Sequence, residues 1–579
     1  MPTATSTSQA TEFLRRTESR LLELSIESQQ ASWVYSTFIT SDTEALAAKA
    51  YSRLIAATVE LAKESTGLPP ESLSDVDRRK VRLLRLSLPL IAPSDPAASG
   101  ELTQTVTQME GTYSRGRHTP IGAREPVDLQ GLSRILAESR DPVLLEDAWA
   151  GWHAVGRGIR KDFVRYVDLA NRGARELGFE DTGAMWRSKY DMPPASFARE
   201  VDRLWEEVRP LYVALHAYVR RRLREIYGAD HVPERGPIPA HLLGNMWAQS
   251  WEALTPRLAP PRSTPPIDLT RILQDRHTTA EGMVRYAEAF FISLGLPPLP
   301  ESFWTRSMLL RPKDREVVCH ASAWDVDLVE DLRIKMCIEI TGEDFHTVHH
   351  ELGHNFYQRA YANQPYLFRD SAHDGFHEAV GDTISLSVTP EYLERIGLIE
   401  RAPDASGDLD LLLFRALEKI AFLPFGLVVD KWRWEVFSGA IRPEELNASW
   451  WALRERYQGI APVRARDETE FDAGAKYHVP ANVPYMRYFL AHILQFQFHR
   501  ALAGVIGSDG PLHRASIYGS KEAGRRLLAM LEMGSSRDWR DALESLTGER
   551  RMEARGLLEY FAPLKAWLDQ QNQGVPVGW

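Results

Sequence analysis

The sequence predicts a mostly α-helical protein, built as one large unit with a short β-hairpin. Long stretches place apolar residues at three- and four-residue steps, which is the periodicity of amphipathic helices. Alternating patterns typical of strands are scarce, and no change of composition divides the 579 residues into separate domains. Hydrophobic residues make up 44% of the chain and charged residues 26%, so the apolar content suffices for a large core.

The helical pattern recurs along the whole chain. We expect helices where it is clearest, in 13–38, 45–62, 140–177, 197–226, 268–294 and 485–506. The proline-rich segments 232–239 and 256–266 are predicted to be loops. No uninterrupted apolar run approaches the roughly 20 residues that a membrane-spanning helix needs.

The best strand candidates are 315–324 and 333–340, two short β-branched runs that predict a hairpin. Each run carries one of the two cysteines of the chain, Cys319 and Cys337. Two cysteines are too few for a disulfide framework. From the residues alone, they form either one bridge around a short loop or two buried thiols.

The charge of the chain argues against one class of partner. The net charge of −10, from 69 basic and 79 acidic residues, gives no electrostatic footprint for nucleic acid. The N-terminal residues are rich in Thr and Ser and lack the apolar core of a secretory signal. The protein is therefore either cytoplasmic or has lost such a signal.

The most informative stretch is 345–358, which contains the motif His-Glu-x-x-His. On a helix, His350 and His354 lie one turn apart on the same face and can bind one Zn²⁺. Glu351 then lies beside the open coordination position, where it can take a proton from an attacking water molecule. The alternative interpretation is a helix that carries incidental histidines.

A second helical stretch, 374–387, can complete the metal site. Glu378 and Asp382 are four residues apart and share one helix face. Glu378 can add the third ligand of a His₂Glu zinc site, and Asp382 can accept a hydrogen bond from the ring N–H of a ligand histidine. The adjacent His377 is expected to point about 100° away from Glu378. The alternative is an ordinary acidic helix face.

Two further segments fit the hydrolysis of a peptide bond. Residues 476–488 carry Lys476, His478, Tyr485, Arg487 and Tyr488. Tyr and His side chains can donate hydrogen bonds to the oxyanion that forms when a carbonyl carbon is attacked, and a Lys suits a carboxylate. Taken alone, this segment fits better the start of an amphipathic helix whose aromatic residues face a core. Gln249, another candidate carboxylate donor, lies in an aromatic segment that could be plain core.

Taken together, these motifs resemble the angiotensin-converting-enzyme-type peptidyl-dipeptidases, the M2 family of zinc metallopeptidases. The resemblance rests on PIPAHLLGNMWAQSW, REVVCHASAWD, TVHHELGH, GFHEAVGD, ALEKIAFLPFG, FDAGAKYHVP, VPYMRYF and LQFQFHRAL, which run in family order from about residue 150. It implies a single zincin-type helical domain over 1–579 with a deep central channel. Within it, 10–140 would form a lid-like helical region and 141–570 the catalytic body.

The resemblance implies the metal site and the catalytic groups. His350, His354 and Glu378 would bind one zinc ion, and Asp382 would support a ligand histidine. Glu351 would act as general base and then as general acid.

The resemblance also implies contacts to the substrate. His478 and Tyr488 would stabilise the oxyanion, and His320 and the backbone of Ala321 would hold the peptide chain. The free C-terminal carboxylate would be bound by Gln249, Lys476 and Tyr485, and the last side chain would be lined by Phe422 and Phe425. Gln249 matters because a carboxypeptidase relative carries Arg at this position, which shortens the pocket to one residue. Gln249 leaves room for two residues beyond the scissile bond.

Family members bind chloride, and we expect chloride to activate this protein. The matching positions are Arg187, Trp450 and Arg454 for one site, and Tyr227 and Arg487 for a second. Arg487 directly precedes Tyr488, so an anion there could hold that tyrosine in register.

The 18-residue spacing of Cys319 and Cys337 matches the central bridge of the family, so the resemblance favours a disulfide. A disulfide implies an oxidising compartment, which favours a periplasmic or secreted protein over a cytoplasmic one. Three residues depart from the family pattern: His373 and Asp374 beside Glu378, and His492 in the last subsite.

The expected function is therefore a monomeric zinc peptidyl-dipeptidase that releases dipeptides from the free C-terminus of oligopeptides. One alternative is a zinc oligopeptidase that cuts internal bonds without needing a free C-terminus. The other is a catalytically silent peptide-binding protein, but neither a ligand nor Glu351 is lost.

Overall fold

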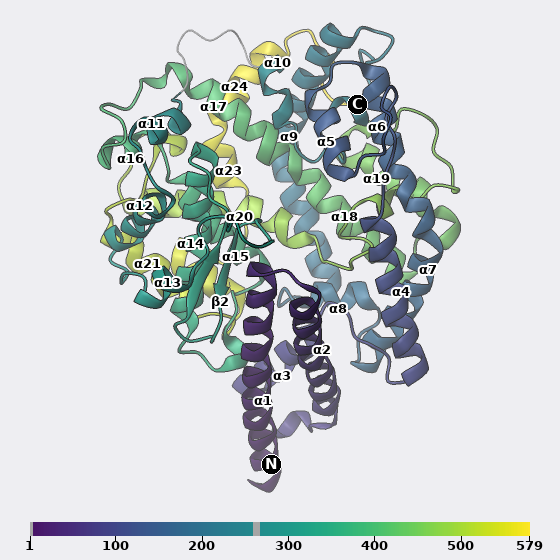
Figure 1. The fold of residues 1–579 in the computed structure, drawn as a ribbon, viewed down its shortest axis with the longest axis vertical. Coiled ribbons are helices and arrows are strands. Elements are labelled where there is room, and N and C mark those ends of the chain that lie inside the picture. Colours follow the sequence, from purple (N-terminus) through teal and green to yellow (C-terminus); the bar gives the residue numbers. More distant parts are fainter. Residues whose placement is uncertain (1–3, 259–266) are drawn as a thin grey trace.

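The structure is a computed structural model that describes residues 4–258 and 267–579, with side chains from residue 9 onward. It is mostly helical, as the periodicity predicts (Figure 1). Three helices at the N-terminus, α1 (Ala4–Thr37), α2 (Ser41–Glu64) and α3 (Asp75–Leu86), project at one end of the molecule. The turn from α1 into α2 is set by Thr40, whose side chain accepts a hydrogen bond from the Thr43 amide.

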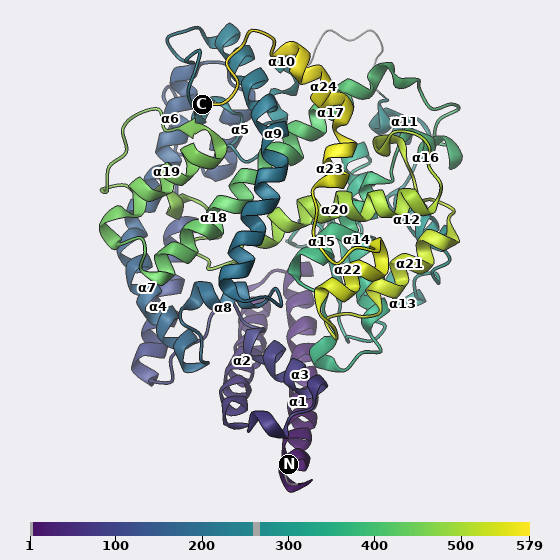
Figure 2. The ribbon, with the colours of Figure 1, turned by 180° about the vertical axis from the view of Figure 1, so that it is seen from behind.

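Seven helices follow in the first half of the chain. They are α4 (Pro96–Ser114), α5 (Leu129–Glu138), α6 (Pro142–His153), α7 (Arg160–Glu176), α8 (Thr182–Ser188), α9 (Pro194–Tyr227) and α10 (Thr255–Leu258). The helix expected over 140–177 is divided, because a 3₁₀ turn over Ala154–Gly158 separates α6 from α7. Helix α9 runs along the rear of the molecule (Figure 2).

The second half of the chain contributes the remaining helices. They are α11 (Leu269–Asp275), α12 (Ala280–Ser293), α13 (Glu301–Arg306), α14 (Gly342–Tyr361), α15 (Asp374–Leu386), α16 (Pro390–Arg395), α17 (Asp408–Arg415), α18 (Ala421–Ser438), α19 (Leu446–Gln458), α20 (Met486–Val505), α21 (Lys521–Leu531), α22 (Trp539–Thr547), α23 (Arg555–Tyr560) and α24 (Ala562–Gln571). The stretch 268–294 forms two helices because Thr279 caps a new helix, α12.

The two proline-rich segments have different outcomes. Most of 232–239 is a loop, and its last two residues form β1 (Ile238–Pro239), which pairs in parallel with β4 (Ile460–Ala461). Of 256–266, the first three residues belong to α10, and residues 259–266 lie outside the described part of the chain.

The predicted hairpin is present but shorter than expected. Strands β2 (Ser322–Asp325) and β3 (Leu332–Lys335) pair antiparallel, with Ser322 opposite Lys335. The residues just before β2 instead pair with the end of α1, where the Ile39 amide donates to Glu316 and the Val318 amide donates to Ser36. Those backbone groups are therefore already used and cannot extend the hairpin.

A disulfide joins Cys319 to Cys337 across this hairpin, with their Cα atoms 5.0 Å apart. The two cysteines border a small apolar cluster that contains Trp33 of α1. The ring of Trp33 meets the ring of Trp324 edge-on at 5.5 Å. The C-terminal end of α1, next to the turn into α2, is thus packed against the hairpin.

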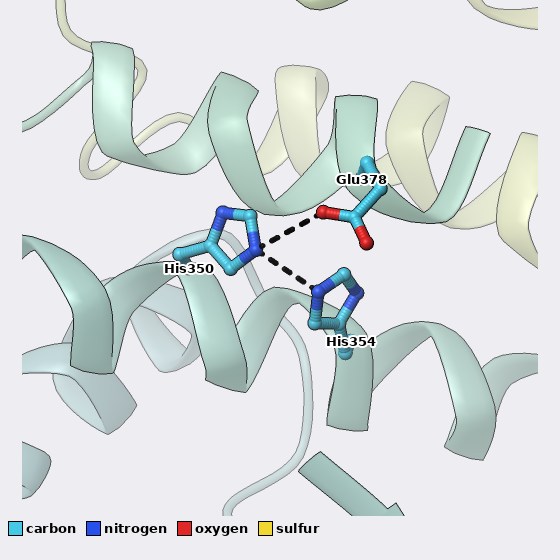
Figure 3. A group of neighbouring side chains, drawn as sticks. All are labelled: His350, His354 and Glu378. Atoms are coloured by element: carbon cyan, nitrogen blue, oxygen red, sulfur yellow. Dashed lines mark hydrogen bonds and ion pairs between the residues drawn. The ribbon is translucent and has the colours of Figure 1, made fainter. Parts of the chain in front are cut away.

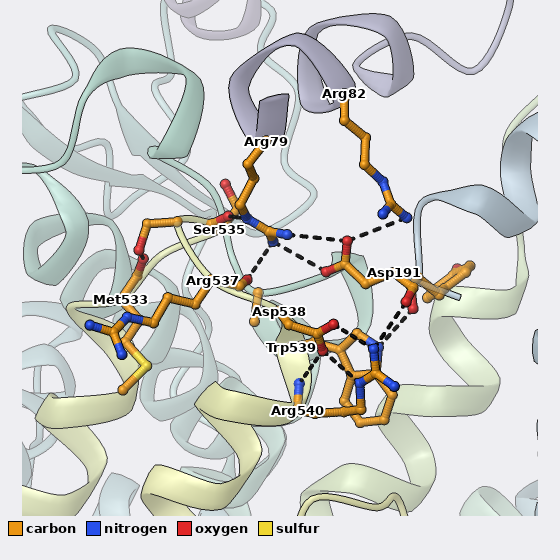
Figure 4. A network of polar contacts seen from close by, with 12 residues as sticks. Arg79, Arg82, Asp191, Met533, Ser535, Arg537, Asp538, Trp539 and Arg540 are labelled. Atoms are coloured by element: carbon orange, nitrogen blue, oxygen red, sulfur yellow. Dashed lines mark hydrogen bonds and ion pairs between the residues drawn. The ribbon is translucent and has the colours of Figure 1, made fainter. Parts of the chain in front are cut away.

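The N-terminal helices have a second attachment at α3 (Figure 4). Arg79 donates to the carbonyls of Ser535 (2.6 Å) and Arg537 and to the carboxylate of Asp191 (3.2 Å). Residues from three distant parts of the sequence meet at this network.

One continuous apolar core runs through the described chain, from Ala10 in α1 to Leu568 in α24. Within it, α15 packs against both α14 and α20. Among the described residues, no helix is both long and apolar enough to cross a membrane.

A candidate metal centre

Three side chains converge between α14 and α15 (Figure 3). His350 and His354 lie one turn apart on α14, and their Nε2 atoms are 3.0 Å apart. The Oε2 atom of Glu378, on α15, is 3.6 Å from Nε2 of His350. All three ligand atoms lie within 4.8 Å of one another. Two imidazole nitrogens and one carboxylate oxygen aimed at one point are a donor set that suits zinc.

Two glycines allow the helices to approach this closely. A Cβ atom at Gly353 would lie 2.8 Å from the Cα atom of Gly381 on the facing helix. A Cβ atom at Gly381 would lie 2.8 Å from Nδ1 of His350. Any larger residue at either position would therefore push α14 and α15 apart, or displace a candidate ligand.

His350 is held from behind by a carboxylate. Its Nδ1 atom lies 3.1 Å from Oδ1 of Asp382, and the second oxygen of Asp382 accepts from Nζ of Lys419 at 3.3 Å. Burial alone would raise the pKa of Asp382, but Lys419 and His350 outweigh it and hold this pKa far below its usual range. Lys419 belongs to a π-helical turn, Ala416–Ile420, just before α18.

His354 is also held from behind, by a residue that we expected to point elsewhere. Its Nδ1 atom lies 3.2 Å from Nδ1 of His377, whose Nε2 atom lies 3.2 Å from the hydroxyl of Tyr361. His377 still contacts the metal centre although it points away from Glu378, because α14 lies close enough to contact both His377 and Glu378. Helical spacing within α15 could not reveal this contact.

Another buried histidine on α14 faces away from the metal centre. His349 is fully buried, with Nδ1 2.7 Å from the Phe345 carbonyl and Nε2 3.0 Å from the Tyr392 hydroxyl. Burial lowers its pKa to about 4, so it is a neutral core histidine.

Glu351 lies on α14 beside the ligands and is only 8% exposed. Burial raises the pKa of its carboxyl group, and the nearby Glu378 adds to the rise. His320, from the segment just before β2, lies close enough to Glu351 to oppose that rise. The Nδ1 atom of His320 is 2.8 Å from the carbonyl of Ala321. Within the described residues β2 pairs only with β3, so its other edge carries no strand.

His478 lies eight residues before α20, and Tyr488 lies in the first turn of that helix. Their ring centroids are 5.8 Å apart, and burial together with the nearby charge of Glu378 raises the pKa of Tyr488. Burial and the cations Lys476, Arg433 and Arg487 lower the pKa of His478 to about 2, so its ring is neutral. Its Nδ1 atom is buried and has no hydrogen-bond partner in the part of the chain that the structure describes.

The expected carboxylate cluster comes together from two distant segments of the chain, one with Gln249 and one with Lys476 and Tyr485. Nζ of Lys476 donates to Oε1 of Gln249 at 2.7 Å, and the Tyr485 hydroxyl donates to the same oxygen at 3.2 Å. Lys476 is buried over the rings of Trp247 (4.1 Å) and Phe425 (5.5 Å). Burial, reinforced by the charge of Arg454, lowers the pKa of Lys476 to about 7.

The aromatic positions expected at the last subsite adjoin this cluster. The rings of Phe422 and Phe425 lie 5.9 and 5.7 Å from that of Tyr485. His492 stacks on Phe422 at 4.4 Å, so this departure from the family pattern lies beside the subsite. His373 has a different role: it is buried and caps α15 by accepting from the Gly375 amide.

The first expected chloride site is assembled only in part. Trp450 and Arg454 are buried together, and among the described residues the indole nitrogen of Trp450 and two guanidinium nitrogens of Arg454 have no hydrogen-bond partner. Arg187 does not join them, which corrects our expectation. It lies over the ring of Trp434, whereas Arg454 lies over the ring of Phe425, nine residues earlier on α18. That separation is about 13 Å along the helix.

The second expected chloride site is not formed as predicted. Arg487 lies near Tyr190, and the ring of Tyr190 stacks on Phe197 near the start of α9. Tyr227 is the last residue of the same helix, about 45 Å from Phe197 along the helix axis. The helix length therefore rules out a shared site for Tyr227 and Arg487. Instead, Nε of Arg487 lies 3.5 Å from the carboxylate of Asp374, so the chain supplies its own negative charge there.

Comparisons with known proteins cover the whole of this architecture. The family model described as angiotensin-converting enzyme, of the M2 peptidases, matches residues 4–579. Angiotensin-converting enzyme of Bos taurus is 50% identical over 454 residues, which cover 77% of this chain and 35% of that protein. The Rattus norvegicus enzyme is 44% identical over 96% of this chain and 43% of its own length. The Theromyzon tessulatum enzyme is 41% identical over 94% of this chain and 89% of its own length. The chain thus spans less than half of these two mammalian relatives and most of the third protein.

Proposed function

The chain belongs to the angiotensin-converting enzyme family of M2 peptidases, and from this premise we propose that it is a monomeric zinc-dependent peptidyl-dipeptidase. It releases dipeptides from the free C-terminus of oligopeptides. The observation that carries the proposal is the pairing of a His₂Glu centre with a separate Gln–Lys–Tyr cluster that can hold a carboxylate. An enzyme that cuts internal bonds has no need of the second feature.

His350, His354 and Glu378 hold the zinc ion in this proposal. When bound, zinc supplies a Lewis acid that polarises the scissile carbonyl and lowers the pKa of the attacking water. Asp382 keeps the His350 ring oriented, with the proton on Nδ1 and Nε2 directed to the metal.

Glu351 carries the proton transfers. It removes a proton from the attacking water and passes it to the leaving amine. Its raised pKa suits this task, because a carboxyl group with a pKa nearer neutrality both accepts and releases a proton readily. The neutral ring of His478 and the hydroxyl of Tyr488 donate hydrogen bonds to the developing oxyanion.

The carboxylate cluster sets where the chain is cut. Lys476, Tyr485 and the amide of Gln249 bind the C-terminal carboxylate of the substrate, and Phe422 and Phe425 contact its last side chain. The peptide backbone pairs with Ala321 next to His320, at the uncovered edge of β2. These contacts leave two residues between the anchor and the scissile bond.

We propose a chloride site at Trp450 and Arg454, because their buried donors have no partner within residues 4–258 and 267–579. Arg454 and Lys476 both lie over the ring of Phe425, and Arg454 donates to the backbone carbonyl of Trp247, whose ring lies under Lys476, at 2.6 Å. An anion at Arg454 therefore offsets the charge that disfavours protonated Lys476.

The Cys319–Cys337 disulfide supports a periplasmic or secreted location.

The test is mass spectrometry of the products formed from a decapeptide with a free C-terminus. We expect serial loss of C-terminal dipeptides, stopped by a chelator. The same peptide with an amidated C-terminus should be cut at least tenfold more slowly. Single-residue loss, or equal cutting of the amidated peptide at internal bonds, would contradict the proposed anchor.

The Glu351→Gln variant tests the catalytic assignment within the same assay. It removes the base but keeps the size of the side chain, so we expect turnover to fall by about 10²–10⁴-fold while zinc stays bound. Zinc content by atomic absorption is the control. Turnover at the wild-type rate would rule out the assigned role of Glu351.

A further inference from the structure

We propose that His377 is the positioning residue that fixes His354 as a zinc ligand, so that a neutral imidazole serves His354 as the Asp382 carboxylate serves His350. Nothing in the spacing of α15 predicts this role. The inference rests on the metal site of the proposed function, and it concerns metal binding rather than the reaction.

The proton positions follow from the hydrogen-bond network. Nε2 of His354 faces Nε2 of His350 at 3.0 Å and must be unprotonated to bind a metal. A neutral imidazole carries one proton, so in His354 it lies on Nδ1. That N–H points at Nδ1 of His377, 3.2 Å away, which is therefore the acceptor.

The same reasoning fixes the tautomer of His377. Because its Nδ1 accepts, its own proton lies on Nε2 and is donated to the Tyr361 hydroxyl, 3.2 Å away. The chain of donors runs from His354 through His377 to Tyr361, and each step has one possible direction. A ligand histidine usually donates to a carboxylate, a backbone carbonyl or water, so an imidazole is an uncommon kind of acceptor for this N–H.

Packing holds the His377 ring in the required orientation. The ring of Tyr357 lies 4.6 Å from it, and the hydroxyl of Tyr357 accepts a hydrogen bond from the Ala372 amide. Tyr357 is fully buried and Tyr361 is only 6% exposed. His354, Tyr357 and Tyr361 lie three and four residues apart, so one stripe of α14 supplies both the ligand and the walls around His377.

The two ligand histidines therefore have unlike supports. The partner of His350 is a carboxylate that also pairs with Lys419, whereas the partner of His354 is uncharged. The neutral partner contributes little charge to the metal site, so its contribution is the orientation of the His354 ring. Loss of such a partner typically weakens metal binding by about 10–100-fold.

The test compares zinc affinity in four proteins, measured by competition with a chromogenic chelator. His377→Phe keeps a ring beside Tyr357 but removes the acceptor. His377→Asn places a carbonyl oxygen near the position of Nδ1 and restores an acceptor. His349→Phe is the matched control, because it removes a buried histidine of α14 that faces away from the metal. Melting of each apoprotein reports folding separately.

We expect His377→Phe to weaken zinc binding by about 10–100-fold, and His377→Asn to recover most of that loss. His349→Phe should lower the melting temperature and leave zinc affinity unchanged. In the Co²⁺-loaded proteins, the visible absorption band should shift in His377→Phe and return in His377→Asn. Wild-type affinity in His377→Phe, or an equal loss in His349→Phe, would overturn the inference.

Two further outcomes have defined meanings. If His377→Phe does not fold, Tyr361→Phe takes its place, with an expected zinc release that is several-fold faster than in the wild type; an unchanged rate would count against the relay. If the wild-type protein binds zinc but releases no dipeptides, the proposed function fails while the zinc affinities still decide the role of His377.

Discussion

Lys476 is the residue whose chemistry depends most on its surroundings. It is buried over aromatic rings, and the oxygen that Nζ contacts is the uncharged amide oxygen of Gln249. Its pKa of about 7 means that near neutrality the free enzyme holds it partly uncharged. A substrate carboxylate would supply the missing counter-charge, so binding and protonation of Lys476 are coupled.

This coupling predicts a pH dependence. A lysine binds a carboxylate best when protonated, so in chloride-free buffer kcat/KM should fall as the pH rises through about 7. Chloride bound at Arg454 should move this fall to higher pH, because it offsets the repulsion that lowers the pKa of Lys476. The measurement is a set of pH profiles of kcat/KM with and without chloride.

The control for this prediction is Lys476→Arg, which stays charged across the range and should flatten the alkaline fall. Identical wild-type profiles with and without chloride would exclude the link between Arg454 and Lys476. Arg487 should contribute little chloride sensitivity, because Asp374 already lies 3.5 Å from it.

At the scale of elements, the crossing of α14 and α15 determines the metal centre. His350 and His354 come from one helix and Glu378 from the other, so the distance between the helices sets the distance between the ligands. Gly353 and Gly381 make that short distance possible. The π-helical turn before α18 adds Lys419, which reaches the carboxylate behind His350.

The glycine contact can be tested directly with Gly381→Ala. The added methyl group would meet Nδ1 and the carbonyl of His350, so we expect a loss of about 1–3 kcal/mol in unfolding free energy. Zinc affinity should fall as well, because His350 and the helix that carries it are displaced. Chemical denaturation and chelator competition measure the two effects.

Gly100→Ala in α4 is the matched control. A Cβ atom at Gly100 meets no described atom within 4 Å, so this change should stabilise the protein by about 0.4–1 kcal/mol. If Gly381→Ala behaves like Gly100→Ala in both measurements, the close approach of the helices does not govern the site.

At the scale of the whole molecule, the N-terminal helices are fastened at two ends. Trp33 packs against the hairpin that carries the disulfide, close to His320 and Ala321. Arg79 reaches Asp191 and the loop before α22 (Figure 4). The proposed substrate contacts at the hairpin are thus connected by packing to helices that lie far from the metal centre.

Removal of the second attachment should loosen the N-terminal helices. Arg79 is 15% exposed and Asp191 4% exposed in side-chain terms. Arg79→Met removes the Arg79 donor from the buried Ser535 carbonyl and leaves the Asp191 carboxylate with its 3.4 Å contact to Arg82. We expect a loss of about 1–3 kcal/mol and faster proteolytic cleavage between α1 and α4. Arg20→Met, which breaks an exposed pair with Glu60, should change stability by less than about 1 kcal/mol. Equal cleavage rates in the two variants would show that Arg79 does not anchor these helices.

The sequence by itself determined what depends on spacing within one element. The four-residue steps of His350 to His354 and of Glu378 to Asp382 place each pair on one helix face, whatever the helices pack against. The periodicity likewise predicts the long helices, although capping residues such as Thr279 divide some of the predicted stretches. The family motifs added the matching site positions by resemblance.

Only the tertiary structure decided which residues of different elements meet. It turned His377 toward His354, paired Arg487 with Asp374, and left Arg187 and Tyr227 away from their expected partners. The physical reason is that helix geometry sets the directions of side chains along one axis, whereas contacts between axes depend on how closely and at what angle the helices pack. In this protein the glycines at the crossing of α14 and α15 set that distance, and with it the second support of the metal centre.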